Sequence, residues 1–175
     1  MARIRKAIAY RRLERPYTRI SKYRKKTFIK ANPNIRIVKF SMGNRKKEYQ
    51  YTLNLVSKQD LQIRHNALES ARQSSNRVLE KSIGTANYSY QIRPYPHHVL
   101  RENPLAAGAG ADRFSTGMSH AFGKPMGKAA RIKQGQPVIT ISVDKAGLKK
   151  AREALKRASS KLPMSYAIEV LENKK

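Results

Sequence analysis

The sequence of 175 residues contains no cysteine and no tryptophan, and it has no long apolar run. Without cysteine the chain cannot form a disulfide framework, a zinc site with cysteine ligands or an iron–sulfur cluster. No stretch approaches the roughly 20 apolar residues that a membrane-spanning helix needs. The first 15 residues are charged and lack an apolar segment, so we expect no secretory signal there.

Acidic residues are also scarce, which leaves a large excess of positive charge. The chain has 38 Lys and Arg residues against 11 Asp and Glu residues, a formal net charge of +27. This charge repels itself and destabilises the compact state of an isolated chain. We therefore expect a polyanionic partner, and nucleic acid is favoured over an anionic membrane surface.

The positive charge and the glycines are both distributed unevenly. Residues 1–50 hold 17 basic and 2 acidic side chains, a net +15. We predict a basic arm over residues 1–33 and a single α+β domain over residues 34–175. Six of the nine glycines lie between residues 101 and 135. Because glycine interrupts helices and strands, we predict a long loop over residues 102–131 inserted in that domain.

The apolar periodicity of the domain predicts two helices and several strands. Asp60 is a candidate N-cap for the first helix, whose apolar stripe places Glu69, Arg72 and Asn76 on the opposite side. The element order predicts an α+β sandwich in which two helices cover one face of a mixed or antiparallel sheet. The expected helices span residues 60–83 and 145–160, and the expected strands span residues 34–40, 48–56, 88–93, 97–101, 136–144 and 166–171.

Several residues invite a catalytic or metal-binding interpretation that their spacing does not support. Asp112, Ser115 and His120 follow no triad signature, and no Gly-x-Ser-x-Gly turn is present. His97 and His98 are adjacent, so on a strand they face opposite sides instead of sharing a metal ion. We predict that the chain is not an enzyme and binds no metal or cofactor. The rival hypothesis is an RNA-modifying or hydrolytic enzyme that uses Asp112, Ser115 or His120.

Two glycine motifs fail as nucleotide-binding loops. The Gly-x-Gly at residues 108–110 does not follow a buried strand, and Arg113 stands where a dinucleotide motif has its third glycine. Gly123 and Lys124 are followed by proline, whereas a phosphate-binding Walker loop has Ser or Thr there.

The basic arm is the strongest functional signal, because aromatic residues alternate with its cations. Guanidinium groups match phosphate geometry, and aromatic rings stack on unpaired bases. A second basic patch follows at residues 45–47. The candidate RNA-binding residues are Arg3, Arg5, Lys6, Arg11, Arg12, Arg15, Tyr17, Arg19, Lys22, Arg24, Lys25, Lys26, Arg45, Lys46, Lys47, Arg64 and Arg72.

Irregular folded RNA is a better match than duplex DNA. The sequence has no helix-turn-helix, zinc finger or basic zipper to enter a major groove, and no aromatic signature of an RNA-recognition motif. An arm and a long loop are suited to shape-driven binding of folded RNA. An architectural DNA-binding protein is the alternative.

The residues from Gly110 to Pro125, GADRFSTGMSHAFGKP, resemble the signature loop of a ribosomal protein family. That family is large-subunit ribosomal protein L10e, the archaeal and eukaryotic branch of the universal L16 family. The resemblance extends over nearly the whole chain, including Tyr10-Arg11-Arg12, the stretch 67–72 and the stretch 151–158. The chain departs from many relatives at Ser119-His120, where they carry Arg-Gly.

The resemblance implies a hammerhead-type α+β fold in the cytoplasmic ribosome. It implies binding to large-subunit rRNA near the elbow of the A-site tRNA, contact with neighbouring ribosomal proteins, and neither a membrane partner nor a homo-oligomer. The end of the chain at Lys175 resembles archaeal members. The glycine-rich loop points toward the peptidyl transferase centre and tRNA, and its implied contact residues are Gly110, Asp112, Arg113, Phe114, Gly117, Met118, His120, Phe122, Gly123 and Lys124.

Overall fold

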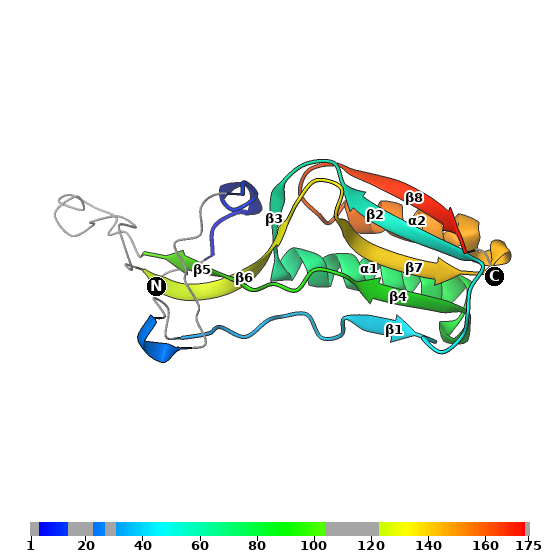
Figure 1. Ribbon diagram of the computed structural model, residues 1–175, viewed down its shortest axis with the longest axis horizontal. Coiled ribbons are helices and arrows are strands. Elements are labelled where there is room, and N and C mark those ends of the chain that lie inside the picture. The colour runs from blue at the N-terminus through cyan, green and yellow to red at the C-terminus, as the bar shows by residue number, and fades with distance from the viewer. Residues whose placement is uncertain (1–3, 14–22, 27–30, 104–122, 174–175) are drawn as a thin grey trace.

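The computed structural model describes residues 4–13, 23–26, 31–103 and 123–173. A five-stranded sheet with two helices occupies one end of an elongated molecule, and a three-stranded sheet extends toward the other end (Figure 1). The helices are α1 (His65–Ser82) and α2 (Leu148–Ser159). The strands are β1 (Ser41–Gly43), β2 (Tyr51–Ser57), β3 (Leu61–Arg64), β4 (Tyr88–Ile92), β5 (His98–Glu102), β6 (Lys124–Ile132), β7 (Pro137–Val143) and β8 (Tyr166–Glu172).

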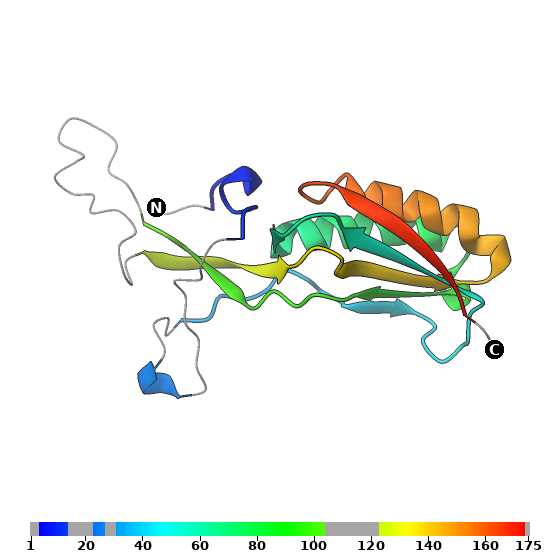
Figure 2. The same ribbon diagram turned by 45° about the horizontal axis from the view of Figure 1, so that its top comes forward.

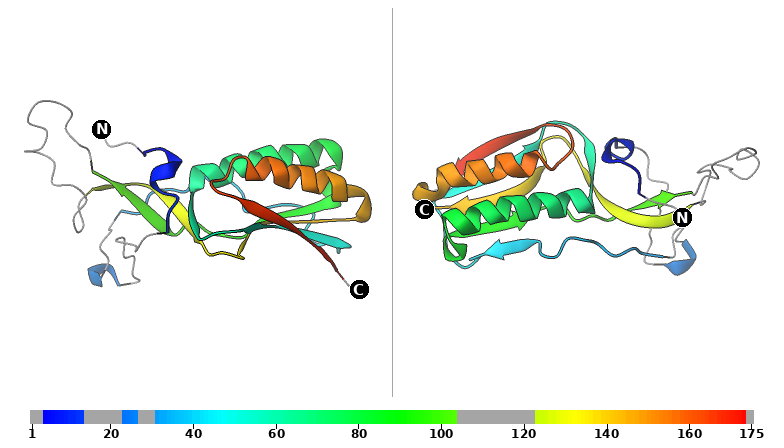
Figure 3. Two further views of the ribbon diagram at one scale, coloured as in Figure 1. Left: turned by 90° about the horizontal axis from the view of Figure 1, so that it is seen from above. Right: turned by 180° about the vertical axis from the view of Figure 1, so that it is seen from behind.

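The five-stranded sheet has the order β1-β4-β7-β2-β8, and every neighbouring pair in it is antiparallel. Both helices lie on one face of this sheet, side by side (Figures 2 and 3). Alternate strand residues such as Leu53, Tyr90 and Ile141 point toward the helices and are fully buried in the same core cluster as Ala151 and Leu155 of α2. The predicted α+β fold with two helices on one face of an antiparallel sheet is confirmed.

The opposite face of this sheet carries hydroxyl and amide groups. One cross-strand row runs through Ser41, Gln91, Thr140, Asn54 and Glu169. The Thr140 hydroxyl donates to Asn54 Oδ1 at 2.8 Å within that row. The neighbouring row runs through Gly43, Ser89, Ser142, Thr52 and Leu171, so neither row contains a lysine or arginine.

The three-stranded sheet has the order β3-β6-β5 and is antiparallel. Its strand β3 corrects the expected helix boundary at Asp60. The helix begins at His65, because Leu61 and Ile63 alternate with Gln62 as a strand and are fully buried. The Asp60 carboxylate accepts a hydrogen bond from Gln134 N at 2.7 Å instead of capping the helix.

Strand β6 (Lys124–Ile132) corrects the expected loop over residues 102–131, because residues 124–131 of that range lie in this strand. Its glycine leaves room for neighbouring side chains. A Cβ atom on Gly127 would lie 2.7 Å from Ile4 Cδ1 and 3.3 Å from His65 Nε2, so a side chain there would displace the end of Ile4. The glycine-rich composition of this region therefore led to the prediction of a loop where the chain forms a largely buried strand.

The strand expected at residues 34–40 is also displaced. Residues 31–39 have no strand partner, and the ladder begins only with β1. Arg36 N donates to His65 Nδ1 at 3.2 Å, and Val38 N donates to Glu69 Oε2 at 3.2 Å. The segment therefore lies along α1 and satisfies its backbone groups with helix side chains.

Candidate nucleic-acid interface

The basic N-terminal segment, residues 4–13, docks on the three-stranded sheet. Tyr10 is buried against Leu100 of β5 and Ala129 of β6, with Ile4 packed beside them. The Tyr10 hydroxyl donates to the Glu102 carboxylate and accepts a hydrogen bond from Arg5 N at 3.0 Å. Burial, together with the hydrogen bond to Glu102, raises the pKa of Tyr10. The phenol therefore stays neutral and holds the segment in place.

Backbone contacts reinforce this docking. Gln62 of β3 donates its amide N–H to Arg11 O at 2.9 Å and its side-chain Nε2 to Tyr10 O at 3.0 Å. Arg64 Nη1 donates to Arg5 O at 2.8 Å. The segment thus becomes a fixed part of the sheet surface, although its composition resembles that of a solvated tail.

The docked segment presents cations outward. Arg5 Nε lies 3.0 Å from Glu102 Oε1, and this hydrogen bond raises the pKa of Arg5, yet 62% of the Arg5 side chain is exposed. Lys6 and Arg12 are exposed as well, and Arg11 is half-buried. These side chains are available to phosphate groups.

The second predicted patch lies at the other end of the molecule. Residues 45–47 are exposed in the connection between β1 and β2, far from the N-terminal segment (Figure 1). Lys47 Nζ lies 2.7 Å from Asp144 Oδ2 and 5.4 Å from the centre of the Tyr49 ring. Arg45 and Lys46 are therefore the freer cations of this patch. The structure does not bring the two basic patches together.

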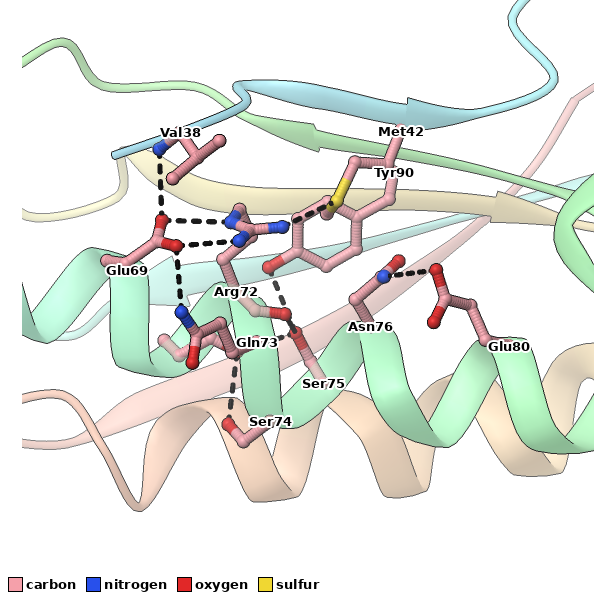
Figure 4. Close-up of polar contacts among 11 residues, drawn as sticks. Val38, Met42, Glu69, Arg72, Gln73, Ser74, Ser75, Asn76, Glu80 and Tyr90 are labelled. Atoms are coloured by element: carbon pink, nitrogen blue, oxygen red, sulfur yellow. Dashed lines mark hydrogen bonds and ion pairs between the residues drawn. The ribbon is translucent and has the colours of Figure 1, made fainter. Parts of the chain in front are cut away.

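Arg72 was expected to face away from the core, and this is wrong. Its guanidinium lies between α1 and β1, where Nη2 is 2.6 Å from Glu69 Oε1 and Nη1 is 3.0 Å from the Met42 sulfur (Figure 4). Only 12% of the Arg72 side chain and 11% of the Glu69 side chain are exposed. Asn76 is buried too and accepts a hydrogen bond from the Tyr88 hydroxyl at 2.7 Å. This side of α1 binds the extended segment 36–42 through polar contacts.

Many of the residues expected to contact RNA lie outside the described part of the chain. Lys25 and Lys26 are exposed, and the backbone of Arg24 lies in the same short 3-10 helix. Of the loop residues, Gly123 with a φ of 96° and the exposed Lys124 lead into β6. The residues outside the described ranges are Arg3, Arg15, Tyr17, Arg19, Lys22, Gly110, Asp112, Arg113, Phe114, Gly117, Met118, His120 and Phe122.

The three-stranded sheet contributes basic residues that the sequence did not single out. Arg101 and Lys128 are more than nine-tenths buried. Arg131 Nη1 is buried without a hydrogen-bond partner among the described residues, as is Nε of the predicted residue Arg64. Burial, aided by the nearby Arg131 and Arg101, lowers the pKa of His98 to about 4. Recognising β6 as a strand would have placed these groups together.

Other kinds of site find no support in the described ranges. No group of three or more His, Asp or Glu side chains there is arranged to hold a metal ion. No helix among the described residues has the length and apolar character needed to cross a membrane.

The family model for ribosomal protein L16p/L10e matches residues 18–169 of the chain. The chain is 45% identical over 171 residues to the large ribosomal subunit protein uL16 of Methanococcus maripaludis, covering 98% of this chain and 96% of the relative. It is 49% identical over 156 residues to the uL16 protein of Staphylothermus marinus, covering 88% and 90%. The uL16 protein of Archaeoglobus fulgidus is 45% identical over 161 residues, covering 92% and 89%. The chain therefore belongs to the ribosomal protein L16p/L10e family.

Proposed function

We propose that this chain is a structural protein of the large ribosomal subunit that binds large-subunit rRNA. The observation that carries the proposal is its near-complete alignment, at 45% to 49% identity, with archaeal proteins named for that subunit. The net charge of +27 supports it, because a folded chain with this excess requires a polyanion. Its place is then the cytoplasmic ribosome, beside neighbouring ribosomal proteins.

The N-terminal segment and the three-stranded sheet form the proposed main rRNA contact, near the elbow of the A-site tRNA. Arg5, Lys6 and Arg12 are exposed on a segment that Tyr10 and Glu102 hold to the sheet. Because the segment is already docked, binding these cations to phosphates orders little additional chain, which favours affinity.

The glycine-rich loop is proposed to reach toward the peptidyl transferase centre and to help position tRNA. Its ends are fixed by β5 and β6, which pair up to the contact between Glu102 and Lys124. These strands belong to the sheet that extends away from the helices (Figure 1). A rigid two-strand base of this kind is a suitable support for a loop that acts at a distance.

The proposed role is non-catalytic, and the comparisons give no support to an architectural DNA-binding protein. Replacing Asp112, Ser115 and His120 together by alanine tests the rival enzyme role. Ribosome incorporation and translation are expected to continue in that variant. Loss of a chemical modification of rRNA, with incorporation intact, would establish the enzyme role instead.

Binding of the purified chain to large-subunit rRNA and to duplex DNA at equal salt tests the proposal directly. We expect rRNA to bind more tightly, with an affinity that falls steeply with salt because each phosphate contact releases a counterion. The plot of log affinity against log salt has a negative slope. Replacing Lys6 and Arg12 by glutamine should make it shallower by about 1.5, since each phosphate contact contributes about 0.7–0.9. Preference for duplex DNA would overturn the proposal.

A further inference from the structure

Helix α2 has an outer face that is far more basic than the rest of the helical layer. Its twelve residues include five lysines and arginines and one glutamate. Ala151, Ala154, Leu155 and Ala158 face the core and are fully buried. The charged side chains therefore form the solvent face of an amphipathic helix.

The five cations of α2 divide into two groups. Lys150 Nζ and Arg157 Nη2 lie 3.4 Å and 3.0 Å from the Glu153 carboxylate, so these two cations are partly neutralised. Lys149, Arg152 and Lys156 are exposed, and no carboxylate of the described residues lies within ion-pair distance of them. Their spacing of three and four residues places them on one stripe, which we call the α2 ridge.

The positions of the α2 ridge residues lower the stability of the helix. Like charges three and four residues apart repel each other. Lys149 lies in the first turn, which contains no acidic residue, although the helix dipole favours anions there. The adjacent Lys150 has the same disadvantage. Cations at such positions are consistent with an anion that binds from outside the chain.

The two faces of the five-stranded sheet also differ in charge. The two cross-strand rows on the opposite face of the five-stranded sheet contain no lysine or arginine. The neighbouring helix α1 pairs its Arg72 internally with Glu69, which leaves Arg77 and Lys81 as its exposed cations. General solubility would be served by cations on either face, whereas a binding surface requires them together.

We infer that the α2 ridge binds the phosphate backbone of RNA, as a contact separate from the N-terminal segment. The inference rests on the proposed function, since rRNA is the polyanion it supplies. Lys149 and Lys156 are about 10 Å apart along the helix axis at 1.5 Å per residue, long enough to follow one RNA strand. The stripe has no aromatic side chain for stacking, so the contact is to phosphates and is independent of base sequence.

The test compares two triple variants that lose the same charge. Lys149→Gln/Arg152→Gln/Lys156→Gln removes the ridge. Lys58→Gln/Lys81→Gln/Lys133→Gln removes three exposed lysines that lie outside α2. Glutamine is a good helix former, so α2 is expected to persist, and circular dichroism checks this. A third variant, Lys149→Arg/Arg152→Lys/Lys156→Arg, keeps the charge of the ridge.

The readout is the slope of log affinity for large-subunit rRNA against log salt. Loss of three phosphate contacts should make the slope shallower by roughly 2 to 2.7 in the ridge variant, and by clearly less in the control. The charge-preserving variant should retain the wild-type slope. Equal slopes for ridge variant and control would overturn the inference while leaving the proposed function intact.

Two further outcomes are distinct. Failure of the wild-type chain to prefer rRNA would overturn the proposed function itself. A ridge variant that binds naked rRNA with the wild-type slope, yet is lost from assembled subunits, would show that an acidic protein occupies the ridge. That result would also overturn the inference.

Discussion

Replacing Glu69 by glutamine should loosen the extended segment 36–42 from α1. The Glu69 carboxylate connects α1 to the extended segment at Val38 (Figure 4). Its Oε2 accepts hydrogen bonds from Val38 N at 3.2 Å and Arg72 Nε at 2.9 Å, and its Oε1 accepts from Arg72 Nη2 at 2.6 Å and Gln73 Nε2 at 3.0 Å. Glutamine keeps the shape of the side chain but removes the charge and one acceptor.

The expected cost follows from the burial of the ion pair. Breaking a buried pair by removing one partner costs roughly 3–5 kcal/mol, because it leaves an uncompensated charge. Here 12% of the Arg72 side chain is exposed and glutamine keeps one oxygen, so we expect about 2–3 kcal/mol. For a chain of 175 residues this corresponds to a fall in Tm of roughly 5–10 °C.

Urea unfolding and hydrogen exchange measure this effect. The free energy of unfolding should fall by the stated amount, and the Val38 amide should exchange faster. Glu80→Gln is a matched control, because Glu80 is exposed on the same helix and accepts one hydrogen bond, from Asn76. It should cost under about 1 kcal/mol.

A double-mutant cycle with Arg72→Met isolates the pair. Glu69→Gln should cost at least 1 kcal/mol less in the Arg72→Met background, since residues in contact couple by about 0.5–3 kcal/mol. An equal cost in both backgrounds would refute the account of Arg72 as an internal partner of Glu69. The same pair predicts acid sensitivity. Its hydrogen bonds hold the pKa of Glu69 below its usual value, so the stability that it provides is lost as pH falls below about 4.5.

Three other substitutions test separate parts of the structure. Gly43→Ala should cost at least 2 kcal/mol more than Gly84→Ala in urea unfolding. Both residues have positive φ, but a Cβ atom on Gly43 would lie 2.2 Å from a backbone oxygen, whereas a Cβ atom on Gly84 would meet nothing within 4 Å. Tyr10→Phe should speed proteolysis of the N-terminal segment and cost about 1–2 kcal/mol, because the Glu102 carboxylate loses a buried donor; unchanged cleavage would contradict the docking. The pKa of His98 is lowered to about 4, so between pH 6.5 and 4 the unfolded chain binds a proton that the folded chain does not. The folded state therefore loses up to about 3 kcal/mol of stability over that pH range, and His98→Gln should abolish this loss.

The helical layer could be predicted from the sequence because its periodicity is strong. The stripe of Leu148, Ala151, Leu155 and Ala158 defines α2 within about three residues at its start and one at its end. The strand around Ile139 was equally clear, because β-branched residues alternate there with Thr and Ser. These elements place the two-helix face correctly.

The three-stranded sheet could not be predicted because tertiary contacts decide it. Gly127 looks like a loop residue, yet it lies in a strand opposite Leu100 of β5, and Ile4, more than 120 positions away, packs over it. Glu69 and Arg72 look like surface residues, and only the distant segment around Val38 makes them internal. Residues 61–64 continue into α1 in the sequence pattern, and their pairing with β6 separates them from it.

The candidate interface was predicted in part. The docked arm residues Arg5, Lys6 and Arg12 are exposed as a binding role requires. Charge counting favoured the N-terminus because it sums over residues and ignores pairing. The list of candidate residues also included Arg72, which is paired internally with Glu69, and omitted Lys149, which has no such partner among the described residues.

Sedimentation of a cell extract at high salt tests the central claim most directly. A structural rRNA-binding protein of the large subunit should migrate with that subunit after a high-salt wash. Its contacts are buried in the assembled subunit and are screened less than those between the isolated chain and free rRNA. The chain should leave that fraction only when the subunit itself is dismantled. Recovery of the chain solely in the soluble fraction, or with duplex DNA, would contradict the account.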